Sequence, residues 1–284
     1  MKIELNTHER CMIDFAAQHP EVLVLSADLG SSCEIKKFRA TYPDRYLTMG
    51  IAEQNMCSWA AGLAREGYRP FLHTFSVFLY RRILDQLEMS VAYPNLPVVF
   101  VGFVPGITTP GGVTHQSIND VGVLRTVPNM AIFDIGDATE IEGVLKLAYD
   151  YNGPVFIRML RKEVPRLFPA NEPMQFNRAR VLSEGDDVLI LSSSICTEEA
   201  MRATAALKDR GVSVQHMHVS TLKPFTDPTI VEALKKVKYG VVTIENQYNI
   251  GGLSSAVSEL IAENGINKRL VKIGLPGYPH GASK

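Results

Sequence analysis

The stretch Val22-Leu23-Val24-Leu25-Ser26-Ala27-Asp28-Leu29-Gly30 decides the fold class of this chain. A short apolar run bounded by turn residues is typical of a strand that is covered on both faces of a parallel sheet. The polar loop that follows lies at the carboxyl end of the strand, where ligands of α/β sheets bind. We therefore expect an α/β fold with a ligand site along that edge.

The residues up to about 160 continue this alternation of apolar runs and helical segments. Helices are predicted at 8–18, at the segment that begins with Glu53, and at 78–92 and 137–151. Further strands are predicted at 46–50, 70–74, 97–102, 130–134 and 154–158. Such alternation predicts a parallel sheet with crossover helices.

The pattern then lapses into the polar, proline-containing sequence LFPANEPMQFNRAR before a second α/β series begins. That series has strands at 188–191, 212–219 and 240–244 and helices at 197–210, 229–237 and 252–264. We therefore expect a parallel-sheet domain at 1–165, a linker at 166–182 and a smaller α/β domain at 183–284.

Composition excludes several function classes. The chain has 284 residues, a formal net charge of −1 and 46% hydrophobic residues, so it can bury a large core but offers no basic field to nucleic acid. It contains neither an eighteen-residue apolar run nor a charged-then-apolar leader, so we expect no membrane insertion and no secretion.

The four cysteines are scattered without metal-ligand spacing, which is typical of reduced thiols in a cytoplasmic protein: Cys11, Cys33, Cys57 and Cys196. The seven histidines are also dispersed, so we expect no metal site in this chain alone.

The segment Gly50-Ile51-Ala52-Glu53-Gln54-Asn55-Met56 places one acid in a small, apolar helix. Low-dielectric surroundings disfavour the charged carboxylate, so such a group can stay protonated and donate a hydrogen bond. About twenty residues later, Phe75 and Phe78 could stack a planar heterocycle. This combination suits a thiamine-type coenzyme, whose aminopyrimidine ring needs a carboxylic acid at its edge and an aromatic face beside it.

Four ordered motifs, GIAEQNM, TFSVFLYRR, GGVTHQ and ENQYNIGGLSSAV, resemble the carboxyl-terminal half of a transketolase over essentially the whole chain. The sequence is also similar to 1-deoxyxylulose-5-phosphate synthases and, more weakly, to the β subunits of 2-oxo-acid dehydrogenases. The resemblance implies a pyrimidine-binding domain of the thiamine-diphosphate type, followed by the small transketolase C-terminal domain.

The resemblance also implies coenzyme contacts. Glu53 corresponds to the catalytic acid that hydrogen-bonds the pyrimidine ring nitrogen of thiamine diphosphate. Phe78 matches the ring that stacks on the pyrimidine, with Phe75 beside it, and Arg81 of the same motif is assigned to coenzyme binding.

Substrate contacts follow from the same resemblance. His115 matches a catalytic histidine that faces the sugar, and Arg161 aligns with an arginine that grips the substrate phosphate through its planar donors. Ser32 aligns with a serine that contacts the phosphate.

The diphosphate-binding half of the family is missing. That half holds the diphosphate and Mg²⁺ through a GDG motif followed by an asparagine, and this chain has no GDG. The resemblance therefore implies a split enzyme, in which an amino-terminal subunit supplies these contacts within an α2β2 assembly. Phe75, Phe78, Tyr80 and His115 are then expected at an interface that looks exposed in the isolated chain.

Two substrate contacts of full-length transketolases are replaced here. A His-Asp-Ser-like stretch gives way to Gly102-Phe103-Val104, and an acid before Gly-x-Thr-His gives way to Pro110-Gly111-Gly112. These departures predict an unusual ketose, such as a deoxy or otherwise modified sugar, in place of the common pentose phosphates.

Alternatives stay open at this point. The chain could take part in ligation of pyruvate to a triose phosphate, serve a lipoyl-bearing 2-oxo-acid dehydrogenase, or be a non-catalytic partner subunit. Each residue also has a structural alternative: Glu53 could compensate a helix dipole, Phe75 and Phe78 could be core, and Arg161 could form an ion pair.

Overall fold

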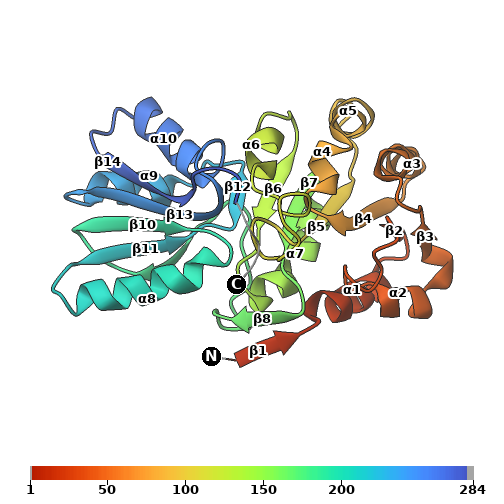
Figure 1. Cartoon of the computed structure of the whole chain (residues 1–284), viewed down its shortest axis with the longest axis horizontal. Coiled ribbons are helices and arrows are strands. Elements are labelled where there is room, and N and C mark those ends of the chain that lie inside the picture. The colour runs from red at the N-terminus through yellow and green to blue at the C-terminus, as the bar shows by residue number, and fades with distance from the viewer. Residues whose placement is uncertain (1, 280–284) are drawn as a thin grey trace.

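Two α/β domains of unequal size, called layers below, lie side by side in the computed structural model, which describes residues 2–279 (Figure 1). The amino-terminal layer is built on a seven-stranded sheet and the carboxyl-terminal layer on a five-stranded sheet. Across the described part of the chain, every helix is too short or too polar to cross a bilayer.

The seven-stranded sheet is parallel except for one edge strand, β12, which runs antiparallel to its neighbour. Its order across the sheet is β12 (Thr221–Lys223), β6 (Ala131–Asp134), β7 (Val155–Met159), β5 (Val99–Phe103), β4 (Arg69–Phe75), β2 (Val22–Ser26) and β3 (Tyr46–Thr48).

Both faces of this sheet are covered, because successive side chains of its strands enter different cores. Along β2, Leu23 and Leu25 belong to one core, and Val22 and Val24 to the other. The first core lies under α3 (Glu53–Arg65), α4 (Phe78–Arg81), α5 (Leu84–Gln86), the π-helix Leu87–Ala92 and α6 (Asp120–Arg125). The second lies under α1 (Thr7–Gln18), α2 (Lys36–Thr41) and α7 (Ala138–Asp150); the 3₁₀ turn Pro43–Arg45 follows α2 and has no buried residue.

The five-stranded sheet follows the same principle on a smaller scale. Its order is β14 (Arg269–Leu275), β13 (Gly240–Tyr248), β10 (Val188–Ser192), β11 (Val214–His218) and β9 (Arg180–Ser183). Ile190 packs in the core that contains Ala200 of α8 (Cys196–Lys208), whereas Leu189 and Leu191 pack with residues of α9 (Pro228–Lys236) and α10 (Leu253–Glu263). A short antiparallel pair, β1 (Lys2–Leu5) and β8 (Glu163–Arg166), completes the fold.

Two sequence expectations differ from the structure. The single helix predicted at 78–92 is broken, because the backbone of Ile83 leaves the helical region at φ −121° and ψ 10°. The predicted linker at 166–182 begins inside β8 and ends inside β9. In addition, β12 of the second half pairs with β6 and so completes the edge of the first sheet.

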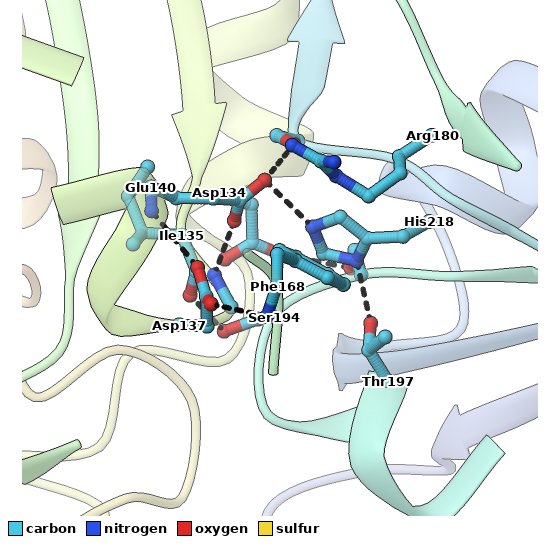
Figure 2. A network of polar contacts seen from close by, with 12 residues as sticks. Asp134, Ile135, Asp137, Glu140, Phe168, Arg180, Ser194, Thr197 and His218 are labelled. Atoms are coloured by element: carbon cyan, nitrogen blue, oxygen red, sulfur yellow. Dashed lines mark hydrogen bonds and ion pairs between the residues drawn. The ribbon is translucent and has the colours of Figure 1, made fainter. Parts of the chain in front are cut away.

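A buried polar network, here called the domain joint, connects the two layers (Figure 2). Glu140 of α7 accepts a hydrogen bond from His218 of β11 at 2.9 Å, and His218 Nδ1 lies 2.6 Å from the Thr197 hydroxyl of α8. Ser194 donates to the carbonyl of Ile135 at 3.0 Å.

Arg158 anchors the same joint. Its guanidinium pairs with Asp134 at 2.8 Å and with Asp120 at 3.0 Å, and all three side chains are fully buried. It also donates to the carbonyl of Asn246 at 3.1 Å, while Ser193 donates to Asp134 at 2.8 Å. Arg158 and Asp134 of this ion cluster therefore both form hydrogen bonds with residues of the carboxyl-terminal half.

Candidate functional site

The residues singled out in the sequence all follow carboxyl ends of adjacent strands. Ser32 comes after β2, Glu53 after β3, Phe78 after β4, His115 after β5 and Arg161 after β7. These five strands are contiguous in the sheet, in the order β7-β5-β4-β2-β3. Topology therefore gathers the predicted residues along one edge, where α/β sheets bind ligands.

Glu53 is the first residue of α3, and its side chain is only 3% exposed. Met56, Cys57 and Ala60 of the same helix are fully buried beneath it. The carboxyl group is nevertheless not in purely apolar surroundings, because Arg82 donates to Glu53 Oε1 at 2.8 Å. The apolar helix expected from the sequence is therefore supplemented by a charged partner from the segment after β4.

Adjacent arginines in the TFSVFLYRR motif have different surroundings. Arg81 donates to the hydroxyl of Tyr80 at 2.7 Å and to the carbonyl of Val113 at 3.2 Å. Arg82 reaches Glu53 and lies over the ring of Phe78, with its Cζ atom 3.8 Å from the ring centroid. Sequence reasoning chose Arg81 and missed Arg82; the signal was a buried acid that lacked a cation.

Three aromatic side chains meet beside Glu53. The rings of Phe75 and Phe78 are stacked, with centroids 5.9 Å apart and an interplanar angle of 28°. His115 meets both edge-on, at 6.0 Å from Phe75 and 5.7 Å from Phe78. All three are half-buried, whereas Tyr80, also expected at an exposed interface, is buried, and burial raises its pKa to about 12.

Arg161 joins this cluster to the loop after β2. It donates to the backbone carbonyl of Ser32 at 3.1 Å, and its Cζ atom lies 5.5 Å from the Phe75 ring centroid. Among residues 2–279 no carboxylate lies within ion-pair distance of Arg161, so its charge is not balanced by a structural partner. We call the contiguous set the half-site: Ser32, Glu53, Phe75, Phe78, Arg82, His115 and Arg161.

The loops where this chain departs from full-length transketolases border the half-site. A Cβ atom at Gly111 would lie 2.9 Å from the Cβ of His115, so an acidic residue there would require the loop to shift. Val104, directly after β5, has φ 52°, a left-handed conformation that a β-branched residue rarely adopts. It lines a cavity of about 170 Å³ together with Arg161.

A second cavity, of about 700 Å³, opens beside Glu53, and Arg81, Arg82 and residues 51–55 line it. A buried carboxyl at the wall and a half-buried phenylalanine next to it fit the edge and the face of an aminopyrimidine ring. Within residues 2–279 no cluster of His, Cys, Asp and Glu side chains could hold a metal ion. The half-site therefore has groups that suit the pyrimidine end of the coenzyme.

Comparison with known proteins places both layers in one family. Residues 6–166 match "Transketolase, pyrimidine binding domain" and residues 177–284 match "Transketolase, C-terminal domain". The chain is 34% identical to the 1-deoxy-D-xylulose-5-phosphate synthase of Symbiobacterium thermophilum, covering 93% of this chain but 41% of that protein.

Shorter relatives match over most of their length. The "6-deoxy-6-sulfo-D-fructose transketolase subunit SqwH" of Clostridium sp. (strain MSTE9) is 35% identical over 96% of this chain and 87% of its own. A solved structure described as "Split gene transketolase, inactive beta4 tetramer" superposes with a TM-score of 0.89 at 34% identity, covering 96% of this chain and 88% of that one. The chain therefore belongs to the transketolase family and corresponds to the carboxyl-terminal subunit of a split transketolase.

Proposed function

We propose that this chain provides the pyrimidine-binding half of a thiamine-diphosphate site that transfers a two-carbon ketol unit from a ketose phosphate to an aldose phosphate. The observation that carries the proposal is the position of Glu53, whose side chain is 3% exposed, borders a cavity of about 700 Å³ and is linked through Arg82 to the ring of Phe78. When bound, thiamine diphosphate supplies the carbon nucleophile that cleaves and re-forms the carbon–carbon bond.

Each half-site residue has a role that follows from its placement. Glu53 would hold the pyrimidine ring nitrogen by a hydrogen bond from its carboxyl group, while Phe78 and Phe75 would provide the aromatic face. His115, edge-on to both rings, faces the sugar and exchanges protons with its hydroxyl groups. Arg161 and Ser32 bind the terminal anion of the substrate.

A partner subunit completes the site in this proposal. The sequence has no GDG motif, and the described residues contain no metal cluster, so the partner would hold Mg²⁺ and the diphosphate. The similar split-gene structure is described as an inactive tetramer of one chain type, which supports activity only in a mixed, α2β2 assembly. We place this assembly in the cytoplasm, since all four cysteines are free thiols.

The substrate class is a ketose that ends in a tetrahedral anion. Arg161 has an unbalanced guanidinium, and Gly111 replaces an acidic contact of full-length transketolases. One similar subunit is named for a 6-deoxy-6-sulfo sugar, so a sulfonate is the second candidate after phosphate. Both groups present three oxygens to a planar donor fork.

The test is turnover after co-expression with a neighbouring reading frame that carries GDG. We expect ketol transfer from ketose phosphates by the two-subunit complex and none by the isolated chain. In the complex, Glu53→Gln keeps the shape but removes the acid, so kcat should fall by about a hundredfold or more while assembly survives. Arg202→Ala, on exposed helix α8 with two exposed ion pairs, is the control and should keep full activity.

Other outcomes would select the alternatives. Product from pyruvate and a triose phosphate would favour the deoxyxylulose-phosphate reaction, and reduction of a lipoyl acceptor would favour the dehydrogenase. Robust turnover by the isolated chain would refute the need for a partner.

A further inference from the structure

Arg82 makes both of the contacts that the half-site would offer to a coenzyme ring. Its NH1 atom donates to Glu53 Oε1 at 2.8 Å, and its guanidinium lies over Phe78, 3.8 Å from the ring centroid. A guanidinium group is planar, donates hydrogen bonds in its plane and stacks on aromatic faces. An aminopyrimidine is likewise planar, stacks on aromatic faces and forms hydrogen bonds in its plane, with its ring nitrogen as acceptor from Glu53 where the guanidinium is the donor.

We propose that Arg82 competes with the pyrimidine ring for Glu53 and Phe78 and must move away before the coenzyme binds. This autoinhibitory contact rests on the proposed function of Glu53 and Phe78. It adds a step that the resemblance to transketolases does not supply.

The Arg82 guanidinium and the coenzyme ring exclude each other because both need the same two groups, the Glu53 carboxyl and the Phe78 ring. The other aromatic neighbours of Phe78 are more distant: Phe75 at 5.9 Å and His115, edge-on, at 5.7 Å. Arg82 is thus the group that covers the ring closely. The Glu53 carboxyl is 3% exposed, so a ring that approaches it has to pass the guanidinium that already binds it.

The surroundings of Arg82 also allow its side chain to move. Its side chain is 43% exposed, and among the described residues its hydrogen-bond partner is Glu53 alone. It stands at the break between α4 and α5, directly before Ile83, whose side chain is fully buried and fixes the backbone there. The cavity of about 700 Å³ beside it gives the released side chain room.

The contact has a physical purpose in the unassembled chain. Glu53 is almost fully buried, and an acid in such a place is costly without a partner. Arg82 provides that partner until the coenzyme does. Arg82 is the exposed member of this pair, and cation–π contacts at exposed sites are weak, so a ligand that replaces both contacts can displace the arginine.

The experiment measures binding of thiamine diphosphate with Mg²⁺ to the isolated full chain, by calorimetry and by ligand-observed NMR for weak binding. We expect Arg82→Ala to bind about five- to tenfold more tightly than wild type, because the competing contacts are gone. Arg82→Lys keeps the charge but loses the stacking, so about a two- to threefold gain is expected. Arg202→Ala should bind like wild type.

Weaker or unchanged binding by a folded Arg82→Ala chain would overturn the inference, since Arg82 would then be a coenzyme contact or a bystander. If neither chain bound the ligand alone, the same comparison on the two-subunit complex would decide, and equal or weaker binding by Arg82→Ala there would overturn the inference. Should Arg82→Ala fail to fold, Arg82→Lys decides the matter alone. Adding Glu53→Gln to Arg82→Ala separates the two proposals: if binding does not weaken, the proposed function fails, whatever the effect of Arg82.

Discussion

Arg158 in the domain joint and Arg82 in the half-site both pair with acids, but in opposite ways. Arg158 is fully buried between two carboxylates, Asp120 and Asp134, and also donates to the backbone of the second layer. Arg82 is 43% exposed and holds one carboxylate and one ring face. A buried arginine with several hydrogen-bond partners, such as Arg158, can hold two domains together. A partly exposed arginine with few partners, such as Arg82, can be displaced by a ligand.

The largest expected loss of stability comes from removing the arginine of the domain joint. Arg158→Met leaves Asp120 and Asp134 buried without their cation, and we expect the free energy of unfolding to fall by about 3–5 kcal/mol. Urea unfolding measures this loss, with Arg202→Ala as the matched surface control at roughly zero. A loss below about 1 kcal/mol would mean that the joint is not a rigid element.

The second-largest expected effect is a loss of folding stability at acidic pH. Burial lowers the pKa of His73 and His216 to about 4, and that of His8 lies well below its usual value. The unfolded chain then binds more protons than the folded one below about pH 6.5, so stability falls as the pH falls.

Between about pH 7 and about pH 5.5 the expected loss is roughly 1 kcal/mol for each of His73 and His216, and His8 adds to it in the same direction. Urea midpoints at the two pH values measure the loss, and His216→Asn should remove its own share of the dependence, roughly 1 kcal/mol. A flat stability profile over this range would contradict the burial of these rings as neutral groups.

The smallest expected change in stability is at the half-site. Glu53→Gln should change the free energy of unfolding by less than about 1 kcal/mol, because its partner is a partly exposed arginine. The same substitution is expected to abolish most turnover in the complex. If instead it destabilised the chain as much as Arg158→Met, Glu53 would be a structural ion rather than a site residue.

Much of the fold could be predicted from local sequence. Runs such as residues 22–25 become strands covered on both faces because every side chain in them is apolar, and the polar loops after them mark one edge of the sheet. The short strands β9, β12 and β14 were not predicted. All three lie at sheet edges. The side chains of β9 and β14 are exposed or half-buried and β12 has only three residues, so none has the apolar run that identifies a central strand.

The grouping of the candidate residues follows from sequence, whereas the contacts of one arginine do not. Ordered motifs singled out Glu53, Phe78, His115 and Arg161, and the sheet topology brings them together. The choice between Arg81 and Arg82 depends on where the helix breaks, since neighbouring helical positions point about 100° apart. That break lies at Ile83 and is set by long-range packing, which no short stretch of sequence encodes.

The antiparallel strand β12 has a consequence for the modularity of this subunit. Residues 221–223 lie beyond the segment between the two layers, yet they pair with β6 and close one margin of the amino-terminal sheet. A gene cut in that segment would leave β6 with unsatisfied backbone donors and acceptors, an adhesive surface for other chains. Shuffled or truncated versions should therefore carry this strand along, and the natural unit of exchange is the pair of layers together.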